Sequence, residues 1–211
     1  MESLGPSRAP VQVRAFLGVG SSLDPEENVP AALGLLLGTP GVEITGISTF
    51  YRTPPLPAPG ASPDSVAGHP EFLNGVVEIR TLRSPEEITE VLGNIENALG
   101  RVRTQDRYAP RILDLDLLVY RREPGEEGGD VEKRMQEPHV YGDTGPPAHP
   151  DVRSRAWVAL PLLELAPELE LPPDGEPLRE VARQFETPGG TVDREMTKLL
   201  RRRFLPQPRG P

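Results

Sequence analysis

Two similar helix-start motifs divide the first half of this chain and constrain its fold more than any other feature. They are Asp24-Pro25-Glu26-Glu27 and Ser84-Pro85-Glu86-Glu87. A capping residue, a proline at the first helical position and acidic residues in the first turn are typical of a helix N-terminus. The first motif predicts a helix to about Leu37, and the second predicts one that stops at Gly100.

Four strand patterns surround these two helices. Apolar and β-branched residues predict strands over residues 11–17, 42–51, 72–82 and 112–120. Further helical patterns follow at 155–165, interrupted at Pro161, and at 178–185. The resulting βαββαβ order predicts a ferredoxin-like α+β sandwich, an antiparallel sheet with helices packed on one face.

The sequence predicts one domain with long loops. We expect the domain to cover residues 11–186, and residues 1–10 and 187–211 to be flexible termini. Neither end is long enough for a second catalytic domain, so we expect a monofunctional protein. We also expect a monomer. Proline and glycine gather in the predicted long loops, at residues 54–70 and 121–150.

Composition excludes several classes of function. The 211 residues include no cysteine, so disulfides and thiolate chemistry are excluded. The net charge of −9 argues against nonspecific nucleic-acid binding. No apolar run approaches the roughly 20 residues of a membrane span, and the N-terminus has no apolar core like that of a signal peptide. We therefore expect a cytoplasmic protein with no nucleic-acid or membrane partner.

Asp114 and Asp116 are the most informative pair of residues. Side chains alternate along a strand, so both carboxylates point to one face, about 7 Å apart. Their repulsion, roughly 2 kcal/mol at an effective dielectric constant near 20, would be reversed by a bound cation. Magnesium prefers carboxylate and phosphate oxygens. The pair fits either a magnesium site or a solvated face of the sheet.

A basic segment precedes this pair. It contains Arg101, Arg103, Arg107 and Arg111. The planar guanidinium group suits phosphate. Alternatively, these arginines form surface salt bridges. Arginines beside metal-binding carboxylates favour phosphoryl transfer. The chain has neither a GxxxxGK[ST] loop nor an HExxH motif, and Leu23 stands where a dinucleotide fingerprint requires its third glycine.

These motifs resemble, in order, those of the 6-hydroxymethyl-7,8-dihydropterin pyrophosphokinases. The resemblance runs from about Val13 to Leu171. Its most specific block is Arg107-Tyr108-Ala109-Pro110-Arg111-Ile112-Leu113-Asp114-Leu115-Asp116. The other blocks that resemble the family are Gly18 to Leu23, Phe50 to Leu56, Pro70 to Asn74, Gly100 to Arg103, and Ala148-His149-Pro150 with Arg155 and Trp157.

The resemblance implies an enzyme that transfers a diphosphate from ATP to the pterin hydroxymethyl group in folate biosynthesis. Asp114 and Asp116 would hold two Mg²⁺ ions. Arg101 and Arg111 would approach the phosphates, and Arg103 would reach in when its loop closes over the reactants. The residues implied in ATP binding are Glu96, Arg101, Arg111, Leu117, His149 and Arg155. Those implied in pterin binding are Thr53, Pro54, Pro55, Leu56, Phe72, Asn74, Tyr108 and Trp157, with Phe72 and Trp157 stacking on the ring.

The chain departs from the family pattern at a few points. Tyr108 stands where the family commonly has Trp, and residues 121–147 form a longer, acidic insert without a clear counterpart of an expected phosphate-binding arginine. Two other readings stay open beside the active enzyme. One is a catalytically weak relative that binds pterin or nucleotide, and the other is a nonenzymatic ferredoxin-like interaction module.

Overall fold

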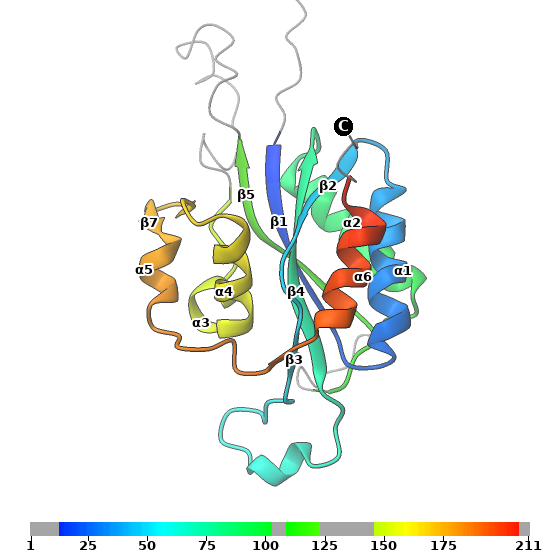
Figure 1. Ribbon diagram of the computed structural model, residues 1–211, viewed down its shortest axis with the longest axis vertical. Helices are drawn as coiled ribbons and strands as arrows, with labels where there is room; N and C mark the ends of the chain where they lie inside the picture. The colour runs from blue at the N-terminus through cyan, green and yellow to red at the C-terminus, as the bar shows by residue number, and fades with distance from the viewer. Residues whose placement is uncertain (1–12, 103–108, 123–145, 207–211) are drawn as a thin grey trace, which may run out of the picture.

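The computed structural model describes residues 13–102, 109–122 and 146–206 (Figure 1). Its elements are β1 (Val13–Ser21), α1 (Pro25–Leu37), β2 (Val42–Ile47), β3 (Tyr51–Thr53), the 3-10 helix η1 (Pro63–Val66), β4 (Phe72–Thr81), α2 (Pro85–Ala98), β5 (Asp114–Arg122), α3 (Asp151–Ser154), α4 (Ala156–Leu165), β6 (Glu170–Leu171), β7 (Glu176–Pro177), α5 (Leu178–Ala182), β8 (Thr191–Val192) and α6 (Arg194–Phe204).

The main sheet is antiparallel and has the strand order β5-β1-β4-β3-β8, with β2 also paired to β4. The sheet order confirms the ferredoxin-like prediction, except that the predicted strand over 42–51 is divided into β2 and β3. The division occurs at Ser48, whose hydroxyl oxygen accepts a hydrogen bond from the Val76 N–H at 2.8 Å. The Ser48 side chain thus accepts a ladder hydrogen bond that a backbone carbonyl would otherwise accept.

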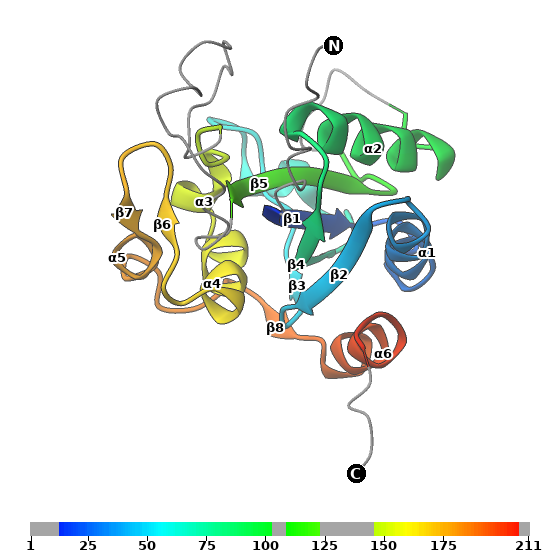
Figure 2. The same ribbon diagram turned by 90° about the horizontal axis from the view of Figure 1, so that it is seen from above.

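Helices cover both faces of the sheet (Figure 2). Helices α1, α2 and α6 lie on one face, over a core that includes Ala15, Leu17 and Val19. Helices α3, α4 and α5 lie on the other face, where Phe16 and Val76 belong to a second apolar cluster. The prediction that helices pack on one face only is therefore wrong, because β1 and β4 also present apolar side chains to the opposite face.

Strand β1 runs through the glycines that were expected to end it at Leu17. Gly18 and Gly20 continue the pairing with both neighbouring strands. A Cβ atom at Gly18 would lie 3.3 Å from Leu118 Cδ2, and one at Gly20 would lie 2.8 Å from Asn74 Oδ1. These glycines therefore make room for neighbouring side chains rather than a turn.

The two predicted helix starts are both confirmed in position, but they differ in how they are capped. Ser84 and Glu87 form a reciprocal capping box at the start of α2. Asp24 precedes α1 with a left-handed backbone (φ 45°), and among the described contacts its side chain makes no capping hydrogen bond. The two starts share a proline at the first helical position and acidic residues in the first turn.

The C-terminal segment belongs to the core, contrary to the expectation of a flexible terminus from residue 187. Helix α6 places Met196, Leu200 and Phe204 in the same apolar cluster as the side chains of α1. The expectation was wrong because it relied on the basic residues of 198–203. The apolar residues Met196, Leu200 and Phe204 recur at helical spacing and form a buried stripe. No helix in the described ranges is long and apolar enough to cross a lipid bilayer.

We expect Leu200→Ala to lower the free energy of unfolding by about 2–5 kcal/mol, because Leu200 is fully buried and the truncation leaves a cavity. Leu199→Ala is the matched control on the same helix, where the side chain is 38% exposed, and it should cost less than about 1 kcal/mol. Urea denaturation of both variants measures the difference. Equal losses would contradict the packing of α6 in the core.

Candidate active site

A row of residues crosses three neighbouring strands and defines a strip on one face of the sheet. Gly20 of β1 pairs with Asp114 of β5 on one side and with Asn74 of β4 on the other. Since Gly20 has no side chain, the Asn74 amide oxygen can lie over it, where a Cβ atom would be only 2.8 Å from Asn74 Oδ1. Any larger residue at this position would meet Asn74. One predicted metal-binding residue, Asp114, and one predicted pterin-binding residue, Asn74, therefore lie on one face of the sheet.

Asp114 is held by two arginines from the segment before β5. Arg101 Nη1 lies 2.7 Å from Asp114 Oδ1, and Arg111 Nη1 lies 2.5 Å from Asp114 Oδ2. Arg101 also pairs with Glu96, a buried side chain of α2. Glu96 Oε1 accepts a further hydrogen bond from the Leu115 N–H at 2.8 Å. Glu96 thus fixes both the arginine and the start of the strand that carries Asp114.

The end of β1 positions Arg111. The Arg111 N–H donates to Ser22 Oγ at 3.0 Å, and the Ser22 N–H donates back to the Arg111 carbonyl at 3.0 Å. Ser21 Oγ donates to the Ile112 carbonyl at 2.6 Å. Both serines are buried. These bonds tie the segment before β5 to the same strand that provides the glycine gap.

Asp116 differs from Asp114 in its electrostatic environment. Burial and the neighbouring Asp114 carboxylate raise the pKa of Asp116 to about 6, and His149 opposes that shift. The described residues contain no group of three or more His, Cys, Asp or Glu side chains that could hold a metal ion. A carboxylate pair nevertheless suits Mg²⁺, which binds through one or two carboxylates, water and substrate phosphates.

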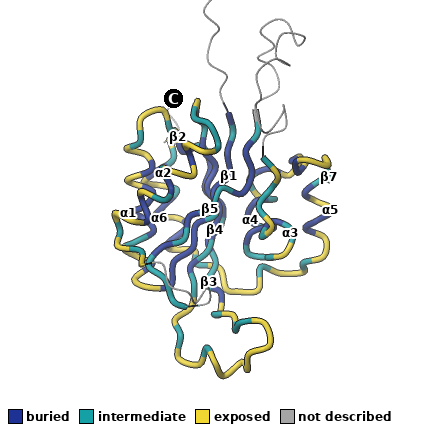
Figure 3. Tube along the Cα trace, turned by 180° about the vertical axis from the view of Figure 1, so that it is seen from behind, coloured by how far each residue is buried: buried dark blue, intermediate teal, exposed yellow. Residues whose placement is uncertain are grey.

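Thr53 and Asn74 form a polar corner at the opposite end of the strip. Asn74 Nδ2 donates to Thr53 Oγ1 at 2.8 Å, and Thr53 is buried. Phe72, which pairs with Thr53 across the ladder, is half-buried. The predicted residues Pro54, Pro55 and Leu56 begin the largely exposed loop between β3 and β4 (Figure 3).

The remaining predicted binding residues, His149, Arg155 and Trp157, lie in or beside helices α3 and α4. The His149 N–H donates to the Leu118 carbonyl at 2.8 Å, which fixes residue 149 beside β5. The Arg155 guanidinium lies 5.4 Å from the centroid of the Trp157 ring. Trp157 packs against the second apolar cluster. Its predicted stacking opposite Phe72 stays a prediction.

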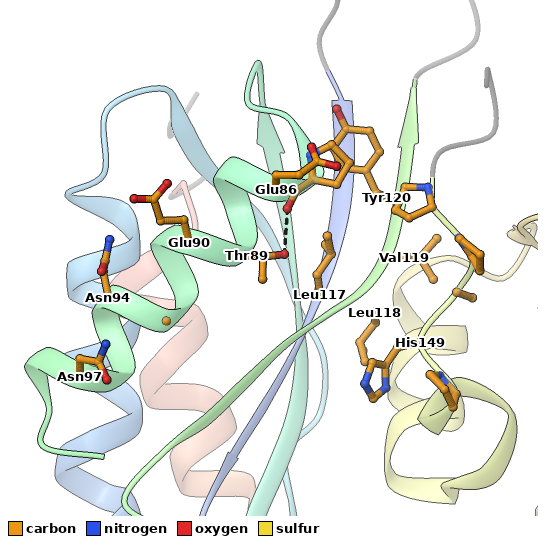
Figure 4. Close-up of a pocket in the computed structure, with 16 residues that line it drawn as sticks. Glu86, Thr89, Glu90, Asn94, Asn97, Leu117, Leu118, Val119, Tyr120 and His149 are labelled. Atoms are coloured by element: carbon orange, nitrogen blue, oxygen red, sulfur yellow. Dashed lines mark hydrogen bonds between the residues drawn. The ribbon is translucent and has the colours of Figure 1, made fainter. Parts of the chain in front are cut away.

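A cavity of about 860 Å³ lies between α2 and residues 146–150, across the edge strand β5. Figure 4 shows Glu90, Asn94 and Asn97 of α2 on one side, Leu117, Leu118 and Val119 of β5 along the floor, and His149 on the other side. Of its lining, the sequence predicted only Leu117 and His149. Gly93 was an available signal, because a glycine inside a predicted helix is unfavourable and can have a packing or functional reason.

Three residues of the predicted phosphate-binding segment lie outside the described residues. They are Arg103, Arg107 and Tyr108. Their expected roles in loop closure and pterin stacking stay predictions.

Comparison with known proteins decides the family. The model of the 7,8-dihydro-6-hydroxymethylpterin-pyrophosphokinase family matches residues 16–167. The chain belongs to this family. As a member of the pyrophosphokinase family, it is an ATP-dependent diphosphotransferase that acts on hydroxymethyldihydropterin in folate biosynthesis.

Individual relatives agree with this assignment. The 2-amino-4-hydroxy-6-hydroxymethyldihydropteridine pyrophosphokinase of Methylorubrum extorquens is 36% identical over 178 residues, which are 83% of this chain and 96% of the relative. The Pseudomonas aeruginosa protein of the same name is 34% identical over 169 residues, 80% of this chain and 89% of the relative. The crystal structure of a Plasmodium falciparum HPPK-DHPS mutant is similar in fold, with a TM-score of 0.51 at 13% identity, over 87% of this chain and 45% of that one.

The raised pKa of Asp116 predicts a pH-dependent stability. The folded protein holds a proton on Asp116 more tightly than the unfolded chain, so this group contributes stability at low pH that is lost as the pH rises through about 6. In EDTA above pH 7, we expect Asp116→Asn to raise the free energy of unfolding by about 1–2 kcal/mol, with a much smaller gain near pH 4. Urea denaturation at both pH values tests this, and an equal gain at both would refute the assignment.

Proposed function

We propose that the strip between the two aspartates and the Asn74–Thr53 corner is where the diphosphate passes from ATP to the pterin. The observation that carries this proposal is the row Asp114–Gly20–Asn74 across three paired strands. It offers carboxylates for a metal–phosphate complex at one end and an amide for a heterocycle at the other. The glycine between them has no side chain that would stand between these two ends.

The pterin would lie at the Asn74 end. Asn74 gives its N–H to Thr53, which leaves the amide oxygen aimed as an acceptor for a ring N–H. The flat ring would stack on Phe72 and Trp157, with Tyr108 as a third aromatic partner. Pro54, Pro55 and Leu56 would form the rim of the pocket through their position directly after Thr53.

Asp114 and Asp116 would hold two Mg²⁺ ions between the strand and the ATP phosphates. When bound, the metal would neutralise phosphate charge and polarise the substrate hydroxyl. The fit rests on the chemistry of the pair. Two carboxylates share one strand face, and both burial and repulsion from Asp114 raise the pKa of Asp116, an unfavourable charge that a divalent cation would offset.

The arginines would change partners when substrates bind. Arg101 and Arg111 both contact Asp114 in the protein alone. Both arginines would leave Asp114 free to hold a cation, and their guanidinium groups would donate to phosphate oxygens instead. Glu96 would keep Arg101 in position during this exchange, and Arg103 would join them when its loop closes. This account requires no protein general base, because positioning and electrostatic stabilisation carry the reaction.

The nucleoside of ATP would occupy the cavity at the edge of β5. This cavity includes Leu117 and reaches His149, which is close enough to Asp116 to influence its pKa. Edge-strand backbone groups can pair with the hydrogen-bonding edge of a base. His149 and Arg155 would contact the ATP phosphates. Monomeric state and cytoplasmic location stay predictions.

The test is a coupled assay for AMP with ATP, Mg²⁺ and 6-hydroxymethyl-7,8-dihydropterin. We expect AMP only when pterin and metal are both present, and loss of AMP in EDTA and in Asp114→Ala/Asp116→Ala. Asp116→Ala alone should lower turnover at least about 10²-fold. Well-folded protein that makes no AMP would favour the alternative that the chain is a catalytically weak relative, which binds pterin or nucleotide.

Asn74→Ala tests pterin binding at one end of the strip separately from nucleotide binding at the other. We expect it to weaken pterin binding by roughly tenfold or more, because the variant lacks the acceptor for the ring, while a nonhydrolysable ATP analogue binds nearly as before. Isothermal titration calorimetry with each ligand measures both affinities. An equal loss of both would mean that Asn74 serves the structure of the sheet instead.

A further inference from the structure

Strand β3 is only three residues long, and the C-terminal segment holds its outer edge. Tyr51 and Arg52 pair with Val192 and Thr191 of β8. The Asp193 N–H then donates to the Phe50 carbonyl at 2.9 Å, so the contact continues past the end of the ladder. Since so short a strand does not order itself, its position depends on both of its neighbours.

Thr197, in the first turns of α6, completes this attachment from inside the core. Its Oγ1 accepts a hydrogen bond from the Phe50 N–H at 2.9 Å and donates to the Asp193 carbonyl at 2.7 Å. Thr197 is 7% exposed and Phe50 is fully buried. Without this hydroxyl, the buried Phe50 N–H would have no acceptor, which is costly.

Asp193 and Gly190 hold the same strand from its exposed side. Asp193 Oδ2 accepts from Arg52 Nε at 2.9 Å, while Oδ1 accepts from the Met196 N–H at 3.0 Å and caps α6. Gly190 lies so close to β3 that a Cβ atom would be 2.1 Å from the Arg52 carbonyl oxygen. One carboxylate therefore joins the start of the helix to the strand.

The inner edge of β3 carries the proposed pterin corner. Tyr51 pairs with Asn74, and Thr53 accepts the hydrogen bond from Asn74. The Phe50 ring fills the space above Gly75, where a Cβ atom would lie 2.6 Å from the ring. A shift of residues 50–53 would therefore move Thr53 relative to Asn74.

We propose that Asp193 and Thr197 are positioning residues for the pterin pocket, which they serve by fixing β3 through Phe50 and Arg52. This inference rests on the proposed function, because it requires the Thr53–Asn74 corner to bind the pterin. Neither residue lies in the row Asp114–Gly20–Asn74 or in the β5-edge cavity. Their effect should therefore be on pterin affinity and not on nucleotide affinity.

Thr197→Val and Thr197→Ser form the decisive pair of variants. Valine keeps the shape and removes the hydroxyl, whereas serine keeps the hydroxyl. We expect Thr197→Val to raise the pterin Kd and KM about tenfold with kcat within about threefold, and to leave the Kd of a nonhydrolysable ATP analogue within about twofold. Thr197→Ser should restore most of the pterin affinity. Lys198→Gln, at an exposed position of the same helix, is the control and should match the parent.

Hydrogen exchange of peptides that cover residues 50–56 provides a second readout, which does not depend on activity. Exchange there should be faster in Thr197→Val than in Thr197→Ser. If Thr197→Val does not fold, Asp193→Asn replaces it, because asparagine still caps α6 but loses the charge that pairs with Arg52. We expect that variant to weaken pterin binding by about threefold or more.

Unchanged pterin affinity in a folded variant, or equal losses for pterin and nucleotide, would overturn the inference while the proposed function stands. A parent protein that makes no AMP and binds no pterin is a different result. In that case the proposed function fails, and the positioning role fails with it.

Discussion

Asp114 and Asp116 place two negative charges on one face of β5, and the surroundings of that face are organised around them. Arg101 and Arg111 neutralise Asp114, and buried Glu96 fixes Arg101. Asp116 is left with the burial and repulsion that raise its pKa. Such an arrangement of carboxylates is costly for the protein alone, and the proposed cations and phosphates would offset that cost.

The glycines of β1 make this charged face continuous with the polar corner at Asn74. β1 lies between β5 and β4, so a side chain at Gly20 would stand between Asp114 and Asn74. The two helical layers then divide the tasks. Helices α1, α2 and α6 bury the main core, and helices α3 to α5, on the other face, cover the second apolar cluster, against which Trp157 packs.

Sequence reasoning recovered the features that depend on local chemistry. The alternation around Asp114 and Asp116, and the proline-marked helix starts, depend on residues close in the chain, and all are present in the structure. It missed the continuation of β1 through Gly18 and Gly20. Two glycines close together predict a turn, and only the pairing with the neighbouring strands shows that the strand continues. It also missed the β5-edge cavity, which α2, β5 and residues 146–150 form together although they are separate segments of the chain.

The sequence by itself determined the family, the order of elements and the chemical character of the site, since motif residues carry that information in their types and spacing. Only the tertiary structure decided that α6 belongs to the core and that its first turns hold β3. Those contacts join residues more than 130 positions apart, such as the Phe50 N–H and Thr197. Their partners are chosen by packing, and no local pattern near Phe50 or Thr197 indicates the other.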